Sequence, residues 1–196
     1  MGTGGFLAEP EPSDAVEAKY AADRADDGYV MNLTRVWAQA PAVDDAWTAF
    51  AGTAAEAAGL TFRQKGIVVT ALAAAMGDAY CSLAWGTRLA RASDAPTARA
   101  VLDGTDEGLD DDERTIAAWA RQLVRDPNGT TAADVDALRR AGFDDRAILG
   151  LTAYIAARIA FSTVNDVLGA ISDAELRAAA PPAVLDAVTY GRAATA

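Results

Sequence analysis

The sequence is divided into short segments by repeated helix start and stop signals, and this division limits the fold more than any other feature. Asp110 precedes Glu113 by three residues, and Thr131 precedes Asp134 by the same distance, so both pairs match the capping-box pattern. Glycines follow the apolar runs, where a left-handed residue ends a helix. No stretch alternates between apolar and polar residues, and alanine, the best helix former, prevails. The sequence therefore predicts an all-α bundle.

The same signals place the helices along the chain. The expected helices begin, in order, near Asp14, Leu33, Pro41, Thr61, Asp78, Ser93, Asp110, Thr131 and Asp144. In the helix that begins at Pro41, apolar residues at helical spacing predict one buried stripe, made of Val43, Trp47, Phe50 and Ala54. One further short helix is expected near Pro181 and Pro182. We expect residues 1–12 to form a flexible arm, residues 13–170 the helical domain, and residues 171–196 a C-terminal extension.

Composition excludes several classes of partner and site. The 196 residues suit a single domain, and the net charge of −11 argues against nucleic acid and anionic membranes as partners. Arg158 interrupts the longest apolar run, residues 147–164, which favours a buried helix over a membrane span. The chain has one cysteine and no histidine, so neither an internal disulfide nor a zinc site is expected. A secretory signal would require a positively charged segment near its start, but no Lys or Arg occurs in the first eighteen residues. We expect a cytoplasmic protein without a cofactor.

Three phrases carry a resemblance to a known family. The phrase "DAYC" begins one expected helix and "AARIAFSTVNDVLG" ends the long one. Between them stands "DDERTIAAWARQLVRDPNGTTAADVDALRRAGFDDRAILGLTAYIA". Over roughly residues 12–170 this order resembles the alkyl hydroperoxidase D (AhpD)-like and carboxymuconolactone decarboxylase family. The resemblance implies an AhpD-like helical bundle that oligomerises, with the activity of either a thiol peroxidase or a cofactor-free decarboxylase.

The chain departs from the family's peroxidase pattern at most of the polar positions. Cys81 occupies the position of the first thiol, but Ala84 stands where the resolving cysteine would be. Trp85 and Arg88 hold the two places where the family's histidine falls, and Gly66 aligns with its glutamate. A peroxidase of this kind needs an attacking thiolate, a resolving thiol and proton-transferring groups. Classical two-cysteine peroxidase activity is therefore not expected.

Two interpretations of Cys81 remain open from the residues alone. A helix start nearby and Arg88 within two turns favour a thiolate. A lone cysteine on an alanine-rich helix is also explained, and better, as a small buried apolar side chain. Asp78 lies one turn before Cys81, but a free carboxylate is a poor base for a thiol.

The long helix carries a line of polar residues at spacings of four: Tyr154, Arg158 and Ser162. A buried arginine needs a partner, so Arg158 should meet either a carboxylate such as Asp78 or a ligand anion. The first would be a structural ion pair, and the second an anchor for a carboxylate-bearing or enolisable ligand. The family's packing places this line near residues 78–88, and we expect any ligand site between the two.

Three functions follow from these residues. The first is a cofactor-free enzyme acting on a small organic acid or carbonyl compound, with Arg158 stabilising an enolate. The acid-base group would be one of Cys81, Tyr154 and Asp78, and the expected substrate-binding residues are Arg158, Trp85, Arg88, Tyr80 and Ser162. The second is a non-catalytic binding or structural member of the family. The third is a weak one-cysteine peroxidase that uses an external thiol.

Self-association is the expected interaction with another protein. Four tryptophans and many alanines exceed what short helices around one core should hide, and the tryptophans are Trp37, Trp47, Trp85 and Trp119. The family resemblance also implies an oligomer. We therefore expect a homo-oligomer, a dimer or larger.

Overall fold

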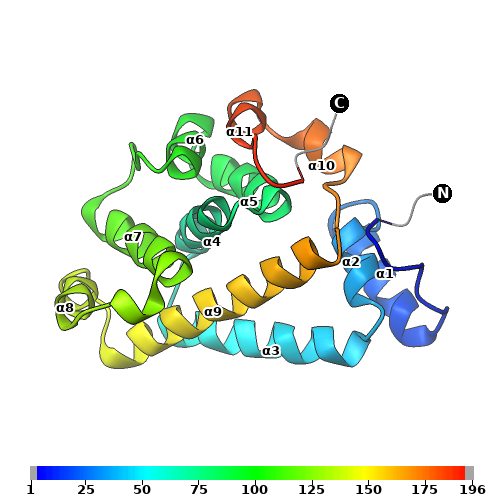
Figure 1. Ribbon diagram of the computed structural model, residues 1–196, viewed down its shortest axis with the longest axis horizontal. Coiled ribbons are helices and arrows are strands. Elements are labelled where there is room, and N and C mark those ends of the chain that lie inside the picture. The colour runs from blue at the N-terminus through cyan, green and yellow to red at the C-terminus, as the bar shows by residue number, and fades with distance from the viewer. Residues whose placement is uncertain (1–3, 193–196) are drawn as a thin grey trace.

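The computed structural model describes residues 4–192, which form eleven α-helices and one 3-10 turn without a strand (Figure 1). The helices are α1 (Asp14–Asp26), α2 (Asn32–Trp37), α3 (Pro41–Ala58), α4 (Phe62–Met76), α5 (Ala79–Ala92), α6 (Ala95–Asp103), α7 (Asp111–Arg125), α8 (Ala132–Arg140), α9 (Asp145–Val167), α10 (Ala174–Ala179) and α11 (Pro182–Ala187), with η1 (Pro127–Gly129) before α8. The all-α prediction is confirmed.

The predicted capping residues hold most of the helix ends. Thr61 and Asp110 form complete capping boxes, and Asp78 Oδ1 accepts a hydrogen bond from the Cys81 amide. Gly77 ends α4 with φ of 74°, a left-handed conformation that strains other residues. Asp14 and Glu17 also have the capping-box spacing, which predicts Asp14 as the cap of the first helix, but the cap is Ser13. Ser13 has an extended backbone and its Oγ accepts from the amide of Val16, whereas Asp14 is already helical.

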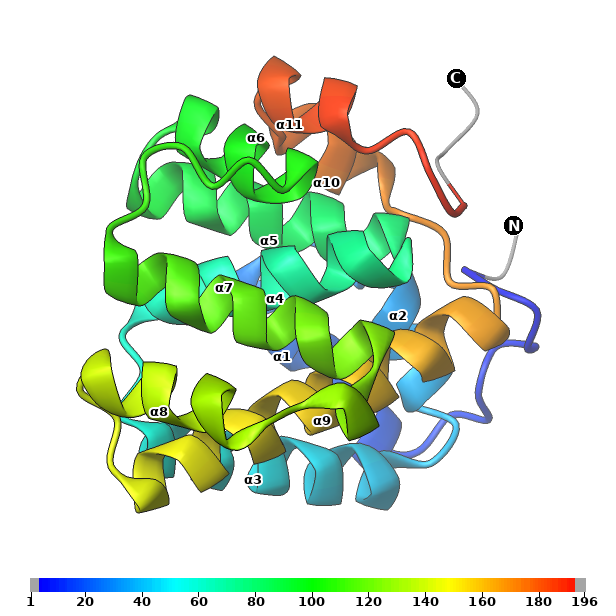
Figure 2. The same cartoon turned by 60° about the vertical axis from the view of Figure 1, so that its left-hand side comes forward.

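The helices pack in two connected groups. In Figure 1 the long α9 lies antiparallel to α3, and in Figure 2 α4 lies between α5 and α7. Helix α6 contacts both α4 and α5, and α11 packs against α5 and α6 (Figure 2). The α3–α9 contact is close at Gly150, where a Cβ atom would lie 2.5 Å from the Ala58 nitrogen. This packing brings the middle of α9 near the start of α5.

The predicted stripe of α3 is wrong at two positions. Val43 and Phe50 are 59% and 54% exposed, while Ala54 is buried and Trp47 donates its indole N–H to the Ala157 carbonyl. The face that meets α9 is made of small side chains, because only these permit so close an approach: Ala51, Ala54, Ala55 and Ala58. The larger Val43 and Phe50 therefore lie on the outer face.

The tryptophans do not provide the surplus of apolar surface that we expected. Trp37 and Trp119 are buried, and Trp47 and Trp85 are half-buried against the core. Four of the exposed large apolar side chains instead lie on α3 and α9: Val43, Phe50, Leu149 and Val167. The homo-oligomer stays a prediction, and it now concerns this outer face.

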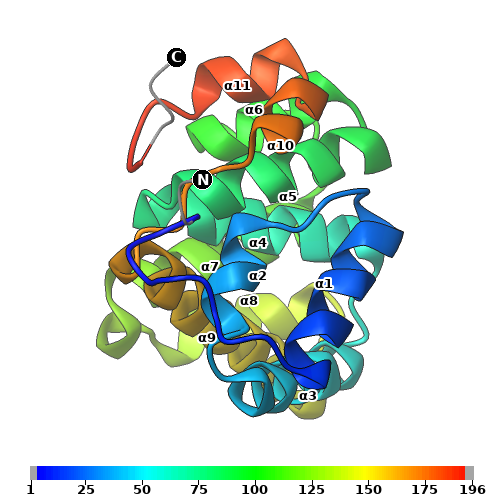
Figure 3. The same cartoon turned by 90° about the vertical axis from the view of Figure 1, so that its right-hand side faces the viewer.

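The N-terminal end of the described chain contacts the end of α9, and its C-terminal end contacts the start of α5. The Phe6 amide donates to the Leu168 carbonyl at 2.8 Å, and the Ile171 amide donates to the Gly4 carbonyl at 3.1 Å. At the other end of the chain, the Tyr190 hydroxyl donates to Ser82 Oγ at 2.9 Å. A Cβ atom at Gly191 would lie 2.3 Å from the Gly77 carbonyl oxygen. The C-terminal segment thus packs over the start of α5, and it holds two short helices where we expected one (Figure 3).

One helix within residues 4–192, α9, has the length and mean hydropathy of a membrane span, with a mean hydropathy of 1.6. It packs against α3, α4 and α7 inside the domain, and the core helix of a soluble protein meets the same criteria. This agrees with the interpretation of residues 147–164 as a buried helix.

Candidate functional site

Cys81 lies in the first turn of α5 and is almost completely enclosed, with 2% of its surface exposed. Its Sγ atom is 3.7 Å from Nη2 of Arg158, which donates to it from α9. Burial raises the pKa of the Cys81 thiol to about 12, the charge of Asp78 raises it further, and Arg158 acts in the opposite direction. The thiol is therefore protonated at neutral pH, and its environment suits a proton donor or an apolar side chain more than a nucleophile.

Arg158 is 7% exposed, and aromatic rings rather than carboxylates surround its guanidinium. The guanidinium carbon lies 5.5 Å from the Trp47 ring centroid, 5.2 Å from that of Trp85 and 4.9 Å from that of Phe161. Its Nε atom has no hydrogen-bond partner within residues 4–192.

The ion pair between Asp78 and Arg158 is not formed. No carboxylate within residues 4–192 lies in ion-pair distance of Arg158. Asp78 is fully buried, and its Oδ2 atom has no hydrogen-bond partner in the same part of the chain. The structural ion pair that the sequence suggested for Arg158 is therefore absent from residues 4–192.

A cavity of about 280 Å³ opens beside Cys81 and Arg158. It is lined by Met31, Leu33, Phe62, Tyr80, Cys81, Ala84, Trp85, Arg88, Arg158 and Phe161. The lining is mostly apolar and aromatic, with two guanidinium groups and one thiol, as in many small-molecule sites. We refer to it as the Cys81 cavity.

Trp85 forms a wall of the Cys81 cavity between the two cations. Its ring lies 5.2 Å from the guanidinium carbon of Arg158 and 5.2 Å from that of Arg88. The Phe62 ring, which is exposed, lies 6.4 Å from the Trp85 ring and stands at the solvent side of the cavity. The position where the family has histidine is thus an aromatic wall.

Tyr80 contributes its ring to the Cys81 cavity, while its hydroxyl is bonded elsewhere. The hydroxyl donates to the Asp173 carboxylate, which also accepts from the Asn32 amide at 2.9 Å. Burial and the charge of Asp173 raise the pKa of Tyr80 well above its usual value. Tyr80 therefore offers the cavity an apolar surface.

Three of the predicted site residues lie behind the cavity and not in its lining. Tyr154 is buried one turn before Arg158, and burial raises its pKa, against the opposing charge of Arg158. Ser162 is fully buried one turn after Arg158, and Asp78 is fully buried at the start of α5. The structure thus brings Tyr80, Cys81, Trp85, Arg88 and Arg158 to one cavity and leaves Tyr154, Asp78 and Ser162 outside it.

Besides Ala84, which stands at the position of the resolving cysteine, four residues of the cavity were missed from the sequence: Met31, Leu33, Phe62 and Phe161. Phe161 could have been found, because it follows Arg158 by three positions and shares its face of the helix. The other three come from distant parts of the chain, and no local pattern marks them.

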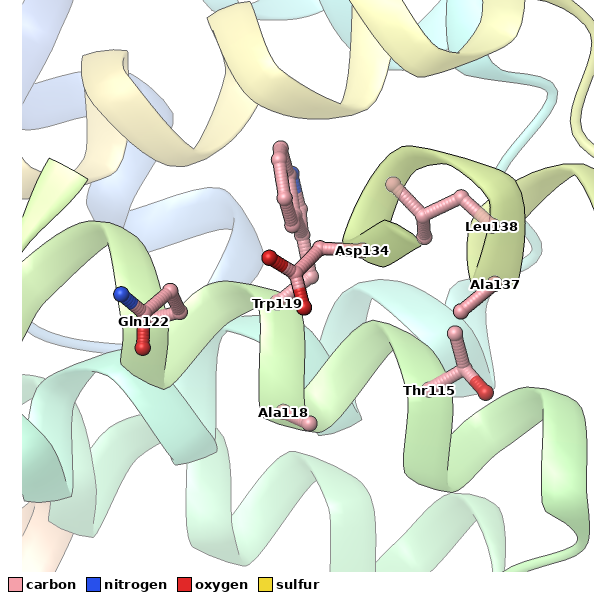
Figure 4. Close-up of a pocket in the computed structure, with 7 residues that line it drawn as sticks. All are labelled: Thr115, Ala118, Trp119, Gln122, Asp134, Ala137 and Leu138. Atoms are coloured by element: carbon pink, nitrogen blue, oxygen red, sulfur yellow. The ribbon is translucent and has the colours of Figure 1, made fainter. Parts of the chain in front are cut away.

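A separate cleft, of about 240 Å³ and away from the Cys81 cavity, lies between α7 and α8. Figure 4 shows the side chains that line it, among them Trp119 and Leu138. The Trp119 indole N–H donates to Thr152 Oγ1, and Asp134 accepts from the Thr131 amide as part of a helix cap. Its lining holds no cysteine, lysine or arginine. Within residues 4–192, no group of three or more His, Cys, Asp or Glu side chains is placed to hold a metal.

Comparison of the fold with solved structures gives consistent neighbours, although no family model and no curated protein matches the sequence. The AhpD-core, peroxidase-related protein of Ralstonia eutropha JMP134 is 22% identical, with a TM-score of 0.77 over 88% of this chain and 94% of that chain. A peroxidase-related protein of Silicibacter sp. TM1040 is 19% identical, with a TM-score of 0.79 over 89% and 95%. The chain has an AhpD-like fold.

A third neighbour with this AhpD-like fold is the debrominase Bmp8, solved as a cysteine-to-alanine variant in complex with 2,3,4-tribromopyrrole. It is 18% identical, with a TM-score of 0.71 over 93% of this chain and 97% of that chain. At these identities the likeness concerns the fold, and it does not assign an activity.

Proposed function

We propose that this chain binds a small planar organic acid in the Cys81 cavity and acts on it as a cofactor-free enzyme. The observation that carries the proposal is Arg158, a buried cation that lines the cavity and has no carboxylate partner within residues 4–192. Burial of an unpaired guanidinium costs several kcal/mol, and a ligand anion would offset that cost. The rings of Phe62, Trp85 and Phe161 suit a flat, conjugated body.

The groups at the cavity suit proton transfer to carbon. Arg158 would stabilise the negative charge of an enolate, which would form either when water takes a proton from the α-carbon or when a β-keto carboxylate loses CO₂ and the electrons of the broken C–C bond remain as the enolate. The Cys81 thiol would then give its proton to the enolate carbon, so that a C–H bond forms and the S–H bond breaks. The thiolate left beside Arg158 would regain a proton from water. Tyr154 and Asp78 do not line the cavity, which leaves Cys81 as the acid-base group.

Two observations support this choice over the other candidate functions. The raised pKa and enclosure of the thiol disfavour a one-cysteine peroxidase, which needs a thiolate. The Bmp8 complex with 2,3,4-tribromopyrrole supports the ligand's size, since that ligand is a small flat ring held by the same fold. A binding protein without catalysis is the second candidate, because a single acid-base group lines the cavity.

Binding and proton exchange test the proposal separately. Benzoate and phenylpyruvate should bind the wild-type chain, measured by calorimetry, and should not bind Arg158→Met. Arg146→Met is the matched control, because Arg146 lies on the same helix but is exposed. Equal binding by wild type and Arg158→Met would show that Arg158 is not the anchor.

Catalysis is tested by exchange of the methylene protons of phenylpyruvate in D₂O. The wild-type chain should exchange them faster than buffer alone, and Cys81→Ala should not. Binding without faster exchange would favour the non-catalytic function.

A further inference from the structure

A second cavity, of about 210 Å³, adjoins the Cys81 cavity along α5. The two cavities share three lining residues, Met31, Ala84 and Arg88. Figure 3 shows the elements that surround it, with the loop between α1 and α2 running along α5 and α10 lying on the other side. A ligand that passes the Arg88 side chain would therefore reach from one cavity into the other.

Charges of both signs line the second cavity. Asp26, Asp27 and Glu175 supply carboxylates, while Arg88 and Arg91 supply guanidinium groups. None of the five takes part in an ion pair within residues 4–192. An anionic or a cationic ligand group would meet like charges there, so an uncharged polar group suits the cavity best.

Thr87 supplies a second and independent observation. Its side chain lines this cavity and is 3% exposed, and its Oγ1 atom has no hydrogen-bond partner within residues 4–192. A threonine inside a helix usually bonds the carbonyl four residues earlier, as Thr163 does with Ile159. A buried hydroxyl without a partner is unfavourable, and a ligand hydroxyl in the cavity would satisfy it.

We propose that the ligand is an organic acid with two parts. Its carboxylate and planar body occupy the Cys81 cavity, and an uncharged, hydroxyl-bearing end lies in the second cavity, hydrogen-bonded to Thr87. This inference rests on the proposed function, because it takes Arg158 as the anchor of the carboxylate. To the proposed function it adds two properties of the ligand: a length that spans both cavities, and an uncharged hydroxyl group at the end that lies in the second cavity.

The test compares three probes by calorimetry: benzoate, para-pentylbenzoate and para-(hydroxybutyl)benzoate. The last two have the same length and differ in a terminal methyl or hydroxyl group. A hydrogen bond to a buried, otherwise unsatisfied hydroxyl is worth about tenfold in affinity, so the hydroxyl probe should bind wild type about tenfold more tightly than the pentyl probe. Thr87→Val keeps the shape of the side chain and should reduce this ratio to about one.

Thr70→Val is the matched control, because Thr70 is also a buried threonine without a hydrogen-bond partner in the described residues, but it lines neither cavity. It should keep the tenfold ratio. If benzoate binds but the hydroxyl probe shows no advantage in wild type, the second cavity does not hold such an end and the inference is wrong. If none of the three probes binds, the proposed function fails, and the inference fails with it.

Discussion

Replacement of Arg158 by methionine should stabilise the fold, although it removes a buried charged side chain. Methionine has a similar length and can keep the contacts with the rings of Trp47, Trp85 and Phe161. The substitution also removes the hydrogen bond from Arg158 to Cys81 Sγ, which is a weak acceptor. The expected effect is therefore decided by the burial of the guanidinium.

The magnitude follows from what surrounds Arg158. With 7% of its surface exposed and no carboxylate partner in residues 4–192, the guanidinium loses most of its hydration without an ion pair in return. Each contact with an aromatic ring offsets about 0.5–2 kcal/mol of this cost. Replacement of a buried ion pair by apolar groups of similar volume is neutral or stabilises proteins by up to about 4 kcal/mol, and because three ring contacts offset part of the cost of burying Arg158 we expect a gain at the low end, about 1 kcal/mol.

Arg121→Met provides the contrast, because Arg121 is a buried arginine that has a partner. It donates to both carboxylate oxygens of Asp106 at 2.7 Å, and both side chains are mostly buried. Its loss leaves a buried carboxylate unpaired and should lower the free energy of unfolding by about 3–5 kcal/mol.

Urea denaturation followed by circular dichroism measures both changes, at one fixed protein concentration because self-association would shift the midpoints. The same substitution should therefore raise stability at one site and lower it at the other. A loss of about 2 kcal/mol or more in Arg158→Met would refute the reasoning, since it would mean that Arg158 has a stabilising partner.

Three other perturbations give clear expectations. Cys81 should resist alkylation by iodoacetamide at neutral pH in the folded chain. Because burial raises the pKa of its thiol from 9.0 to about 12, the contribution of this thiol to the free energy of unfolding is lost as pH rises through that range. In urea titrations at alkaline pH, Cys81→Ala should therefore lose less stability with rising pH than wild type does. Burial raises the pKa of Asp166 from 3.8 to about 6, so the contribution of this carboxyl group to the free energy of unfolding is full below pH 3.8 and is lost as pH rises through 6. Asp166→Asn should therefore melt at a higher temperature than wild type above pH 6, and at no higher temperature below pH 3.8. In sedimentation experiments wild type should be a dimer or larger, and Phe50→Glu and Leu149→Glu should dissociate it. Leu185→Glu, which changes an exposed residue of α11, should not. A wild-type monomer of 20.3 kDa would contradict this prediction.

The helix boundaries could be predicted because the signals that set them are local. Thr61, Asp78 and Asp110 each bond an amide within three residues, so a short window of sequence contains the whole interaction. The facing of α3 could not be predicted in the same way. Its sequence is apolar on two sides, and the side that packs was decided by the close approach of α9, which the sequence of α3 does not contain.

The candidate site was predicted in part for a similar reason. The spacing of residues on the long helix and the family resemblance together predicted that Cys81 lies near Arg158, and the two side chains are in contact. Spacing could not show how far the cavity extends along α9: it is lined by Arg158 and Phe161, while Tyr154 and Ser162, one turn on either side of Arg158, lie outside it. The wall from Leu33 and Phe62 arises from tertiary packing, which a single helix does not encode.

The contact between Arg158 and Cys81 has a consequence for how the chain matures. Arg158 follows Cys81 by 77 positions, so during translation α5 is made on the order of ten seconds before the helix that covers Cys81. In that interval we expect Cys81 to be open to water, with the acidity and reactivity of an ordinary thiol. Oxidation at this stage would place a larger, polar sulfenic acid where the finished fold leaves 2% of the side chain exposed. A nascent chain oxidised in this way could not close correctly over α5, so the redox state during synthesis would decide how much of the protein reaches its native form.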